Sequence, residues 1–163
     1  MLQAAAAATP LTRMEDVMAI PSGPHEPTTP ELIERLQAPD PSVRLHAAAA
    51  LAAMCSKGRD VVAALVAALR DANVHVRKVA ALGLGDRGPE AAFGVPALCD
   101  ALTDASAGVR RRAAIALGEL GTVAMAALPA LLEALEDPHE LVRDMAAWAL
   151  AEIDPFAERA QAA

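Results

Sequence analysis

The sequence has 163 residues, of which 55% are hydrophobic but only 2% aromatic, and its formal net charge is −7. A chain of this length buries a core of its own, and this composition requires a core of Ala, Leu and Val. The negative charge disfavours nucleic acid as a partner, because it repels polyanions at long range. No apolar run approaches the roughly 18 residues that cross a bilayer, so we expect no membrane span.

Residues 1–28 are predicted to form an N-terminal extension. Its first residues carry no positive charge before their alanines, which disfavours a secretory signal. A short helix with one apolar side is predicted from Leu11, Met14, Val17 and Met18. It can cover the first folded unit or serve a partner, and we expect the first. Prolines then recur every third residue from Pro21 to Pro30, as along one edge of a polyproline II helix, and we interpret them as a stiff linker.

From residue 29 to residue 155 the sequence repeats itself every 33 residues. The dipeptide Val-Arg occurs at 43–44, 76–77, 109–110 and 142–143. One leucine column with the same spacing comprises Leu51, Leu84, Leu117 and Leu150. We therefore divide this part into copies at 29–62, 63–95, 96–128 and 129–155. Residues 156–163 are expected to be a frayed tail.

Each copy has the spacing of two helices joined by a turn. In the third copy Val109, Ala113, Leu117 and Leu120 follow one face of a 3.6-residue helix. At the turns, N-caps are predicted at Asp40, Asn73 and Ser106. In the fourth copy His139 occupies this column, and we expect Asp137 to cap one turn earlier.

The remaining helix boundaries are predicted from Thr, Pro and Gly. Thr29, followed by Pro30, is expected to cap the first helix. Gly88 and Gly121 suit a left-handed helix end. A two-helix unit cannot bury its apolar faces alone, so neighbouring units must stack. The predicted fold is therefore all-α, a right-handed α-solenoid of four helix pairs.

These columns resemble HEAT-like repeats, particularly the short form named for phycobilisome lyases. The resemblance covers residues 29–155 and implies the α-solenoid fold, whereas such arrays serve many unrelated functions. It also implies that Asp71, Asp104 and Asp137 form ion pairs with the arginines of the Val-Arg step, joining adjacent copies. The first copy has Ala38 in the acidic column, so Arg44 is expected to lack one partner.

The resemblance places the second helix of each copy on a concave face, where we predict a partner-binding surface. Read across the helices, this surface has a partly basic edge, an apolar floor and an acidic edge. Such a surface suits a peptide or a protein helix better than a phosphate backbone. The candidate partner-binding residues are Lys78, Leu82, Asp86, Arg111, Arg112, Ile115, Glu119, Met145, Trp148 and Glu152.

Two alternatives to this interpretation stay open. Trp148, the only tryptophan, can anchor a partner or pack under a terminal cap made by Pro155 and Phe156. Arg111 and Arg112 can bind a ligand or form an ordinary solvated face.

No catalytic residue, cofactor or metal site is predicted. HEAT-like hydroxylases bind metal through His-Glu pairs directly after the Val-Arg step, and here those places hold other residues, such as Arg111 and Arg112. Cys55 and Cys99 lack metal-ligand spacing and are expected to be reduced thiols of a cytoplasmic protein. We therefore expect a noncatalytic scaffold for another polypeptide. The alternatives are an accessory subunit of a phycobilin-lyase-like complex and, less favoured, a nucleic-acid-binding protein.

Overall fold

The structure, a computed structural model, describes residues 27–54 and 58–155. The helix predicted at residues 11–18, most of the proline-rich linker, Cys55 and the tail 156–163 lie outside the described residues. Within the described ranges the secondary structure is entirely helical, which confirms the predicted all-α class.

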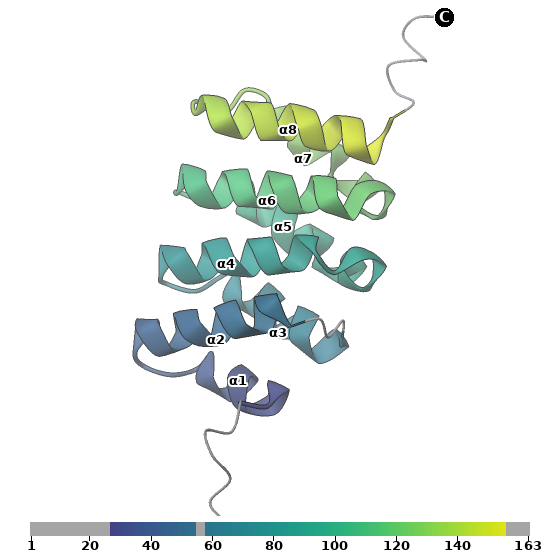
Figure 1. The fold of residues 1–163 in the computed structure, drawn as a ribbon. Helices are drawn as coiled ribbons and strands as arrows, with labels where there is room; N and C mark the ends of the chain where they lie inside the picture. Colours follow the sequence, from purple (N-terminus) through teal and green to yellow (C-terminus); the bar gives the residue numbers. More distant parts are fainter. Residues whose placement is uncertain (1–26, 55–57, 156–163) are drawn as a thin grey trace, which may run out of the picture.

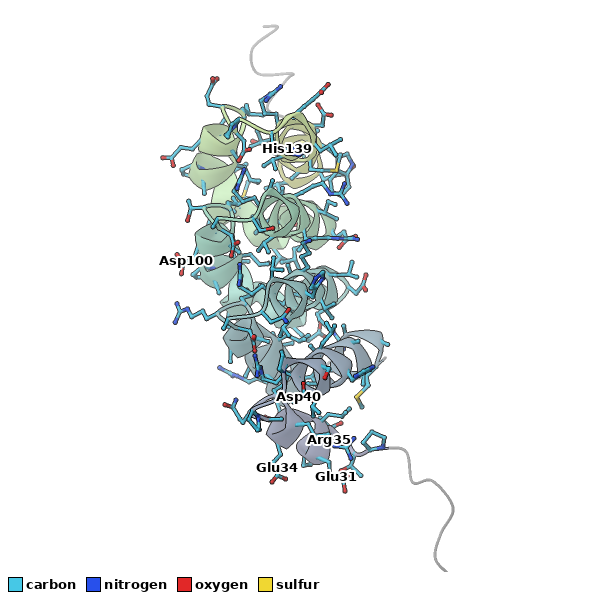
Figure 2. All side chains as sticks on the ribbon, turned by 90° about the vertical axis from the view of Figure 1, so that its left-hand side faces the viewer. Glu31, Glu34, Arg35, Asp40, Asp100 and His139 are labelled. Carbon is cyan, nitrogen blue, oxygen red and sulfur yellow. The ribbon has the colours of Figure 1, made fainter. Side chains whose placement is uncertain are left out.

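The helices form two layers that run the length of the stack (Figures 1 and 2). One layer holds the first helix of each pair: α1 (Thr29–Arg35), α3 (Arg59–Ala68), α5 (Val95–Ala101) and α7 (Leu128–Ala134). The other holds the second helices: α2 (Pro41–Ala53), α4 (Val74–Gly85), α6 (Ala107–Leu120) and α8 (Glu140–Ile153). Two 3-10 helices, η1 (Gly88–Gly94) and η2 (Gly121–Ala127), lead from α4 to α5 and from α6 to α7. The molecule is a helical-repeat solenoid.

The core lies between the two layers and between successive helix pairs, on the columns that the period defines. Val109, Ala113 and Leu117 are completely buried, and Leu120 is only 4% exposed, as the helical spacing predicts. Small side chains dominate this core, so the helices approach closely and each buried leucine stabilises the fold by roughly 1.5–3 kcal/mol. Because each pair buries its apolar side against its neighbours, stability accumulates along the stack.

The four turns within the helix pairs differ in how the second helix is capped. Asp40 and Asn73 cap α2 and α4 as predicted, each accepting a 2.8 Å bond from the backbone N–H two residues later. Ser106 is the N-cap residue of α6 but makes no side-chain cap bond. The prediction for Asp137 was wrong: α8 begins at Glu140, and the Asp137 carboxylate binds the N–H of His139 at 2.8 Å. That carboxylate is held by an arginine of the preceding pair and so belongs to the turn.

The first helix also starts differently from the prediction. Its N-cap is Thr28 rather than Thr29, and the Thr28 N–H donates to the Glu31 carboxylate at 2.8 Å. Pro30 follows within the first turn, where a missing N–H costs nothing. The predicted glycine end is confirmed at Gly121, which is the C-cap of α6 and has a φ angle of +57°. Gly88 also has a positive φ, of +63°, but α4 already ends at Gly85, and Gly88 begins η1 instead.

The stretch from Ala107 to Ala134 is long and apolar enough to cross a membrane by composition alone, which the sequence analysis did not anticipate. In the fold it is not one straight helix. It divides into α6, η2 and α7, with Gly121 in a left-handed conformation between the first two. The apolar side of α6 is buried within the stack, so we interpret the stretch as core.

Arg87 is a buried cation at a position that sequence reasoning passed over. Its side chain is only 2% exposed, although the same column holds Met54, Leu120 and Ile153. The guanidinium donates to the carbonyls of Leu51, Ala52 and Met54 at the end of α2, and its Nε donates to Gly83 at 3.0 Å. A cation at the C-terminal end of a helix satisfies free carbonyls and complements the helix dipole. Arg87 therefore ties the first helix pair to the second.

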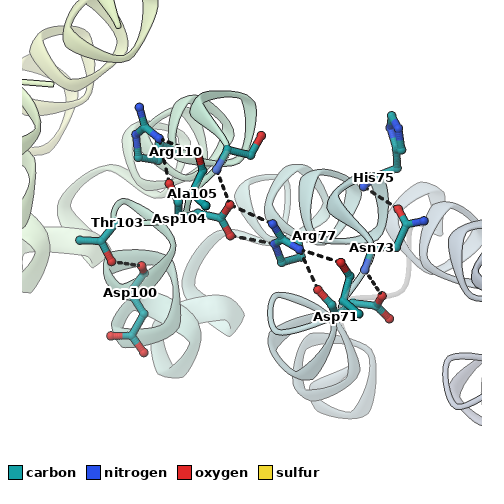
Figure 3. Close-up of polar contacts among 11 residues, drawn as sticks. Asp71, Asn73, His75, Arg77, Asp100, Thr103, Asp104, Ala105 and Arg110 are labelled. Carbon is teal, nitrogen blue, oxygen red and sulfur yellow. Dashed lines mark hydrogen bonds and ion pairs between the residues drawn. The ribbon is translucent and has the colours of Figure 1, made fainter. Parts of the chain in front are cut away.

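A ladder of ion pairs joins adjacent pairs at the opposite end of the second helices (Figure 3). Arg44, Arg77 and Arg110 each make two bonds, of 2.6–3.0 Å, to the aspartate 27 residues later. Those aspartates are Asp71, Asp104 and Asp137. Each arginine also donates Nη1 to the main-chain carbonyl six residues earlier, at 2.8–2.9 Å.

The ladder corrects the expectation for Arg44. Each carboxylate forms its ion pair with the arginine of the preceding copy, so Arg44 pairs with Asp71. What Ala38 removes is the weaker attraction of an aspartate in the same copy, such as Arg77 has from Asp71. The hydrogen bond from Arg44 lowers the pKa of Asp71, and that from Arg110 lowers the pKa of Asp137. Burial raises the pKa of Asp104, but the bonds from Arg77 and from the Ser106 N–H outweigh it, and the net shift is downward.

Candidate partner-binding face

The candidate residues lie on the second helices, or directly at the end of one, with Lys78, Leu82 and Asp86 belonging to α4 and the others to α6 and α8. We call this surface the second-helix face. Four of its members are exposed, namely Asp86, Glu119, Trp148 and Glu152. The remaining six, Lys78, Leu82, Arg111, Arg112, Ile115 and Met145, are half-buried. Every candidate residue therefore keeps part of its side chain in contact with solvent.

Trp148 lies across the neighbouring helix rather than standing away from it. A Cβ added at Gly118 of α6 would come within 2.9 Å of the Trp148 Cε3 atom. Only glycine leaves room for the ring at this point. The residue is nevertheless 38% exposed. Of the cap partners considered for it, Pro155 is itself exposed and Phe156 lies outside the described residues.

The acidic edge shows the same arrangement one helix pair earlier. The Glu119 carboxylate of α6 reaches over Gly85 of α4, where a Cβ would clash with it. Although the residue as a whole is exposed, its carboxylate is partly desolvated. This desolvation and the neighbouring charge of Asp86 raise the pKa of Glu119, and Arg112 opposes the shift. Two carboxylates thus lie close together on this edge, and only one cation of the face offsets them. A cationic side chain of a partner would be attracted to this edge.

The basic edge is formed by Lys78 of α4 with Arg111 and Arg112 of α6. The Lys78 side chain lies against Gly108 of α6, with Cε 2.5 Å from where a Cβ would be. The Nε atom of Arg111 is buried and has no hydrogen-bond partner within the described part of the chain. Because this Nε is buried, an anionic group of a partner would receive hydrogen bonds from the solvent-exposed part of the guanidinium.

The sequence analysis did not identify the glycines against which the Glu119 and Trp148 side chains pack. Gly85 and Gly118 belong to one column, whose other members are Ala52 and Ala151. A column that is small in all four copies was the available signal. Because these positions lack large side chains, Glu119 and Trp148 can extend across the preceding helix, and the face is continuous from α4 to α8.

Two hollows lie mainly along the layer of first helices. One of about 320 Å³ lies between α1 and α3, and one of about 390 Å³ is lined by α7, by the turns that follow α5 and α7, and by Arg110 of α6. Neither is lined by a residue of the second-helix face. Within residues 27–54 and 58–155 no three His, Cys, Asp or Glu side chains are grouped as for a metal ion. The face offers noncovalent contacts over an open surface.

Comparisons with known proteins agree with the architecture. The family model for HEAT repeats matches residues 29–94 and 95–163. No curated protein sequence matches the chain. Human deoxyhypusine hydroxylase, solved in complex with glycerol, is similar at 29% identity with a TM-score of 0.67, over 80% of this chain and 44% of that one.

Two further solved structures are similar. An engineered protein aligns at 27% identity and a TM-score of 0.62, covering 78% of this chain and 62% of its own. The complex of CpcE and CpcF of phycocyanin lyase from Nostoc sp. PCC7120 aligns at 24% identity and a TM-score of 0.57, covering 82% of this chain and 68% of its own. The chain thus spans less than two thirds of the engineered protein and of the hydroxylase. With its 33-residue period, its paired helices and the matched family model, this chain belongs to the HEAT-repeat family.

Proposed function

We propose that the protein is a noncatalytic interaction scaffold that binds another polypeptide on the second-helix face. The observation that carries the proposal is the placement of Trp148, which stays 38% exposed although it is seated on Gly118. Leu82 and Ile115 occupy the same column on α4 and α6. Trp is one of the residue types that supply most of the binding energy in protein interfaces, and the two aliphatic side chains add apolar area beside it.

The chemistry of the face favours a helical partner over an extended one. An extended peptide needs hydrogen-bond partners for both its N–H and its C=O groups, and among side-chain amides Asn and Gln can serve both at once. α4, α6 and α8 contain neither residue type. A helix satisfies its own backbone and presents only side chains, so it can lie on an apolar floor without leaving polar groups unpaired.

The charges at the two edges orient that helix. Acidic residues on one side of the partner would face Lys78, Arg111 and Arg112, and basic residues on the other would face Asp86, Glu119 and Glu152. The likeness to CpcE and CpcF, at 24% identity, bears on the fold alone and does not extend this proposal to bilins. A phosphate backbone would meet the acidic edge and a chain of net charge −7. A cytoplasmic location and the lack of a cofactor are part of the proposal.

The test is a display library of amphipathic helical peptides selected against the wild-type chain. Bound peptides are then measured against a variant with Arg111→Ala, Ile115→Ala and Trp148→Ala. A matched control replaces a cation, an aliphatic and an aromatic residue elsewhere, with Arg70→Ala, Val66→Ala and Phe93→Ala. Loss of binding in the first variant and retention in the second supports the proposal. Equal binding to both variants refutes it.

A further inference from the structure

The ladder of ion pairs has one arginine without a carboxylate. Arg143 of α8 occupies the same column as Arg44, Arg77 and Arg110. Its Nη1 donates to the main-chain carbonyl of Asp137 at 2.8 Å, as the others do to the residue six earlier. Those three also bind an aspartate, whereas Arg143 has no salt bridge within the described residues. The guanidinium is therefore held in the ladder position, and no carboxylate of residues 27–54 or 58–155 pairs with it.

The apolar columns around Arg143 are also more exposed than in the other copies. Ala48, Ala81 and Ala114 are completely buried by the next helix pair, but Ala147 in the same column is exposed. Leu150 is half-buried, and its three counterparts have no exposed surface at all. Leu132 on α7 is 57% exposed, and Leu135 at the C-cap of that helix is half-buried.

We infer that this end of the stack is a second interaction surface, which binds a helix pair of another HEAT-like polypeptide. We call it the terminal face and define it by Leu132, Leu135, Arg143, Ala147 and Leu150. The bound pair carries an aspartate at the start of the turn between its two helices. That aspartate pairs with Arg143 as Asp137 pairs with Arg110. The inference concerns a different surface from the second-helix face and does not depend on it.

The required chemistry follows from the three pairs seen within the chain. In each, the carboxylate receives two arginine bonds and also accepts the N–H of the residue two positions later. The charged bonds are short and directional, so they select an acid at one point of the turn. The exposed apolar columns provide the apolar contact area for a bound helix pair. Arg143 selects a pair that carries an aspartate at the matching position.

A second copy of this chain does not meet the requirement. At its N-terminal end the acidic column holds Ala38, which cannot pair with Arg143. That end does present Val43, 38% exposed where Val76, Val109 and Val142 are buried. A single substitution therefore converts the chain itself into a probe: Ala38→Asp supplies the missing carboxylate on a helix pair of the correct kind.

The experiment uses full-length chains. The probe carries Ala38→Asp and also Arg143→Ala, so that it cannot bind its own terminal face. It is titrated against three immobilised receptors: wild type, Arg143→Ala and Arg143→Lys. We expect binding to the wild type, about tenfold weaker binding to Arg143→Ala, and an intermediate value for lysine, which lacks the bidentate geometry. The wild-type chain used as a ligand is expected to bind weakly. Equal binding by both ligands, or equal binding to all receptors, overturns the inference.

A second measurement tests within one chain whether the terminal face accepts a helix pair. Residues 122–154 are duplicated directly after Asp154, which places a further helix pair in register. In this extended chain Arg143→Ala is expected to lower the urea midpoint, and in the original chain to leave it nearly unchanged. If the midpoint shifts equally in both chains, the terminal face does not accept a helix pair. If only the extended chain responds and the probe does not bind, docking of a separate polypeptide is refuted.

Discussion

Replacing Arg87 by Met tests whether a buried cation joins the first two helix pairs. The substitution keeps most of the side-chain volume but removes every donor. The carbonyls of Leu51, Ala52 and Met54 then lose the guanidinium, which binds the latter two at 2.9 and 2.8 Å. The bond to the Leu51 carbonyl is buried, whereas the bonds to the Ala52 and Met54 carbonyls are part-buried, so that water replaces some of the lost hydrogen bonding there. A buried carbonyl without a partner costs about 1 kcal/mol or more, and we expect the substitution to lower the free energy of unfolding by about 2 kcal/mol.

The measurement is urea unfolding followed by circular dichroism, with the slope compared to confirm that the transition is unchanged. The matched control is Arg70→Met. Arg70 meets Asp100 at 3.4 Å with both side chains more than two thirds exposed, and such a pair contributes less than about 1 kcal/mol. If Arg87→Met and Arg70→Met change the free energy of unfolding by the same amount, the role assigned to Arg87 is wrong.

Three further predictions follow from the packing and the charges. Leu117→Ala is expected to lower the free energy of unfolding by about 2–5 kcal/mol, measured with urea, because Leu117 is completely buried. Leu150→Ala is expected to lower it less, because Leu150 is half-buried at the end of the stack. Equal losses in the two variants would contradict the placement of Leu150 in the last helix pair. The pKa of Glu119 is raised from its ordinary 4.5, so the folded state holds this proton more tightly than the unfolded state and stability falls as the pH rises through the folded pKa. Glu119→Gln is expected to remove this decrease in stability with rising pH. An unchanged pH dependence of stability would contradict the close approach of the Glu119 and Asp86 carboxylates. Gly118→Ala is expected to displace the Trp148 ring and shift its fluorescence emission to the red without unfolding the chain; an unchanged spectrum would show that the ring is not seated there.

Much of the fold could be predicted from the sequence because the period places equivalent residues in equivalent surroundings. The buried stripe of α6 and the caps at Asp40 and Asn73 depend on local spacing alone. The cap at His139 was mispredicted because Asp137 serves the preceding pair, which is a contact between copies. For the same reason the sequence did not predict that each arginine pairs with the aspartate of the following copy. The recurrence of Asp and Arg does not say which copies they join.

The residues of the second-helix face were predicted from the sequence, but the contacts that hold their side chains in place were not. The columns of Leu82, Ile115 and Trp148 could be assigned to one side of their helices from the period. The seating of Trp148 on Gly118 depends on how far α8 is displaced along α6, and a one-dimensional pattern does not contain that displacement. The role of Arg87 was not predicted, because its carbonyl partners on α2 and at its end are 33–36 residues away and the other residues of its column are apolar.

The most direct test of the proposed function uses Trp148 as a reporter, because it is the only tryptophan of the chain. The emission of the wild-type protein is recorded while the tightest helical peptide from the selection, itself without tryptophan, is added. If the peptide covers the second-helix face, the emission shifts to the blue and saturates, and Arg111→Ala raises the midpoint of that titration. An unchanged emission from a protein that demonstrably binds the peptide would place the interaction elsewhere and contradict the proposal.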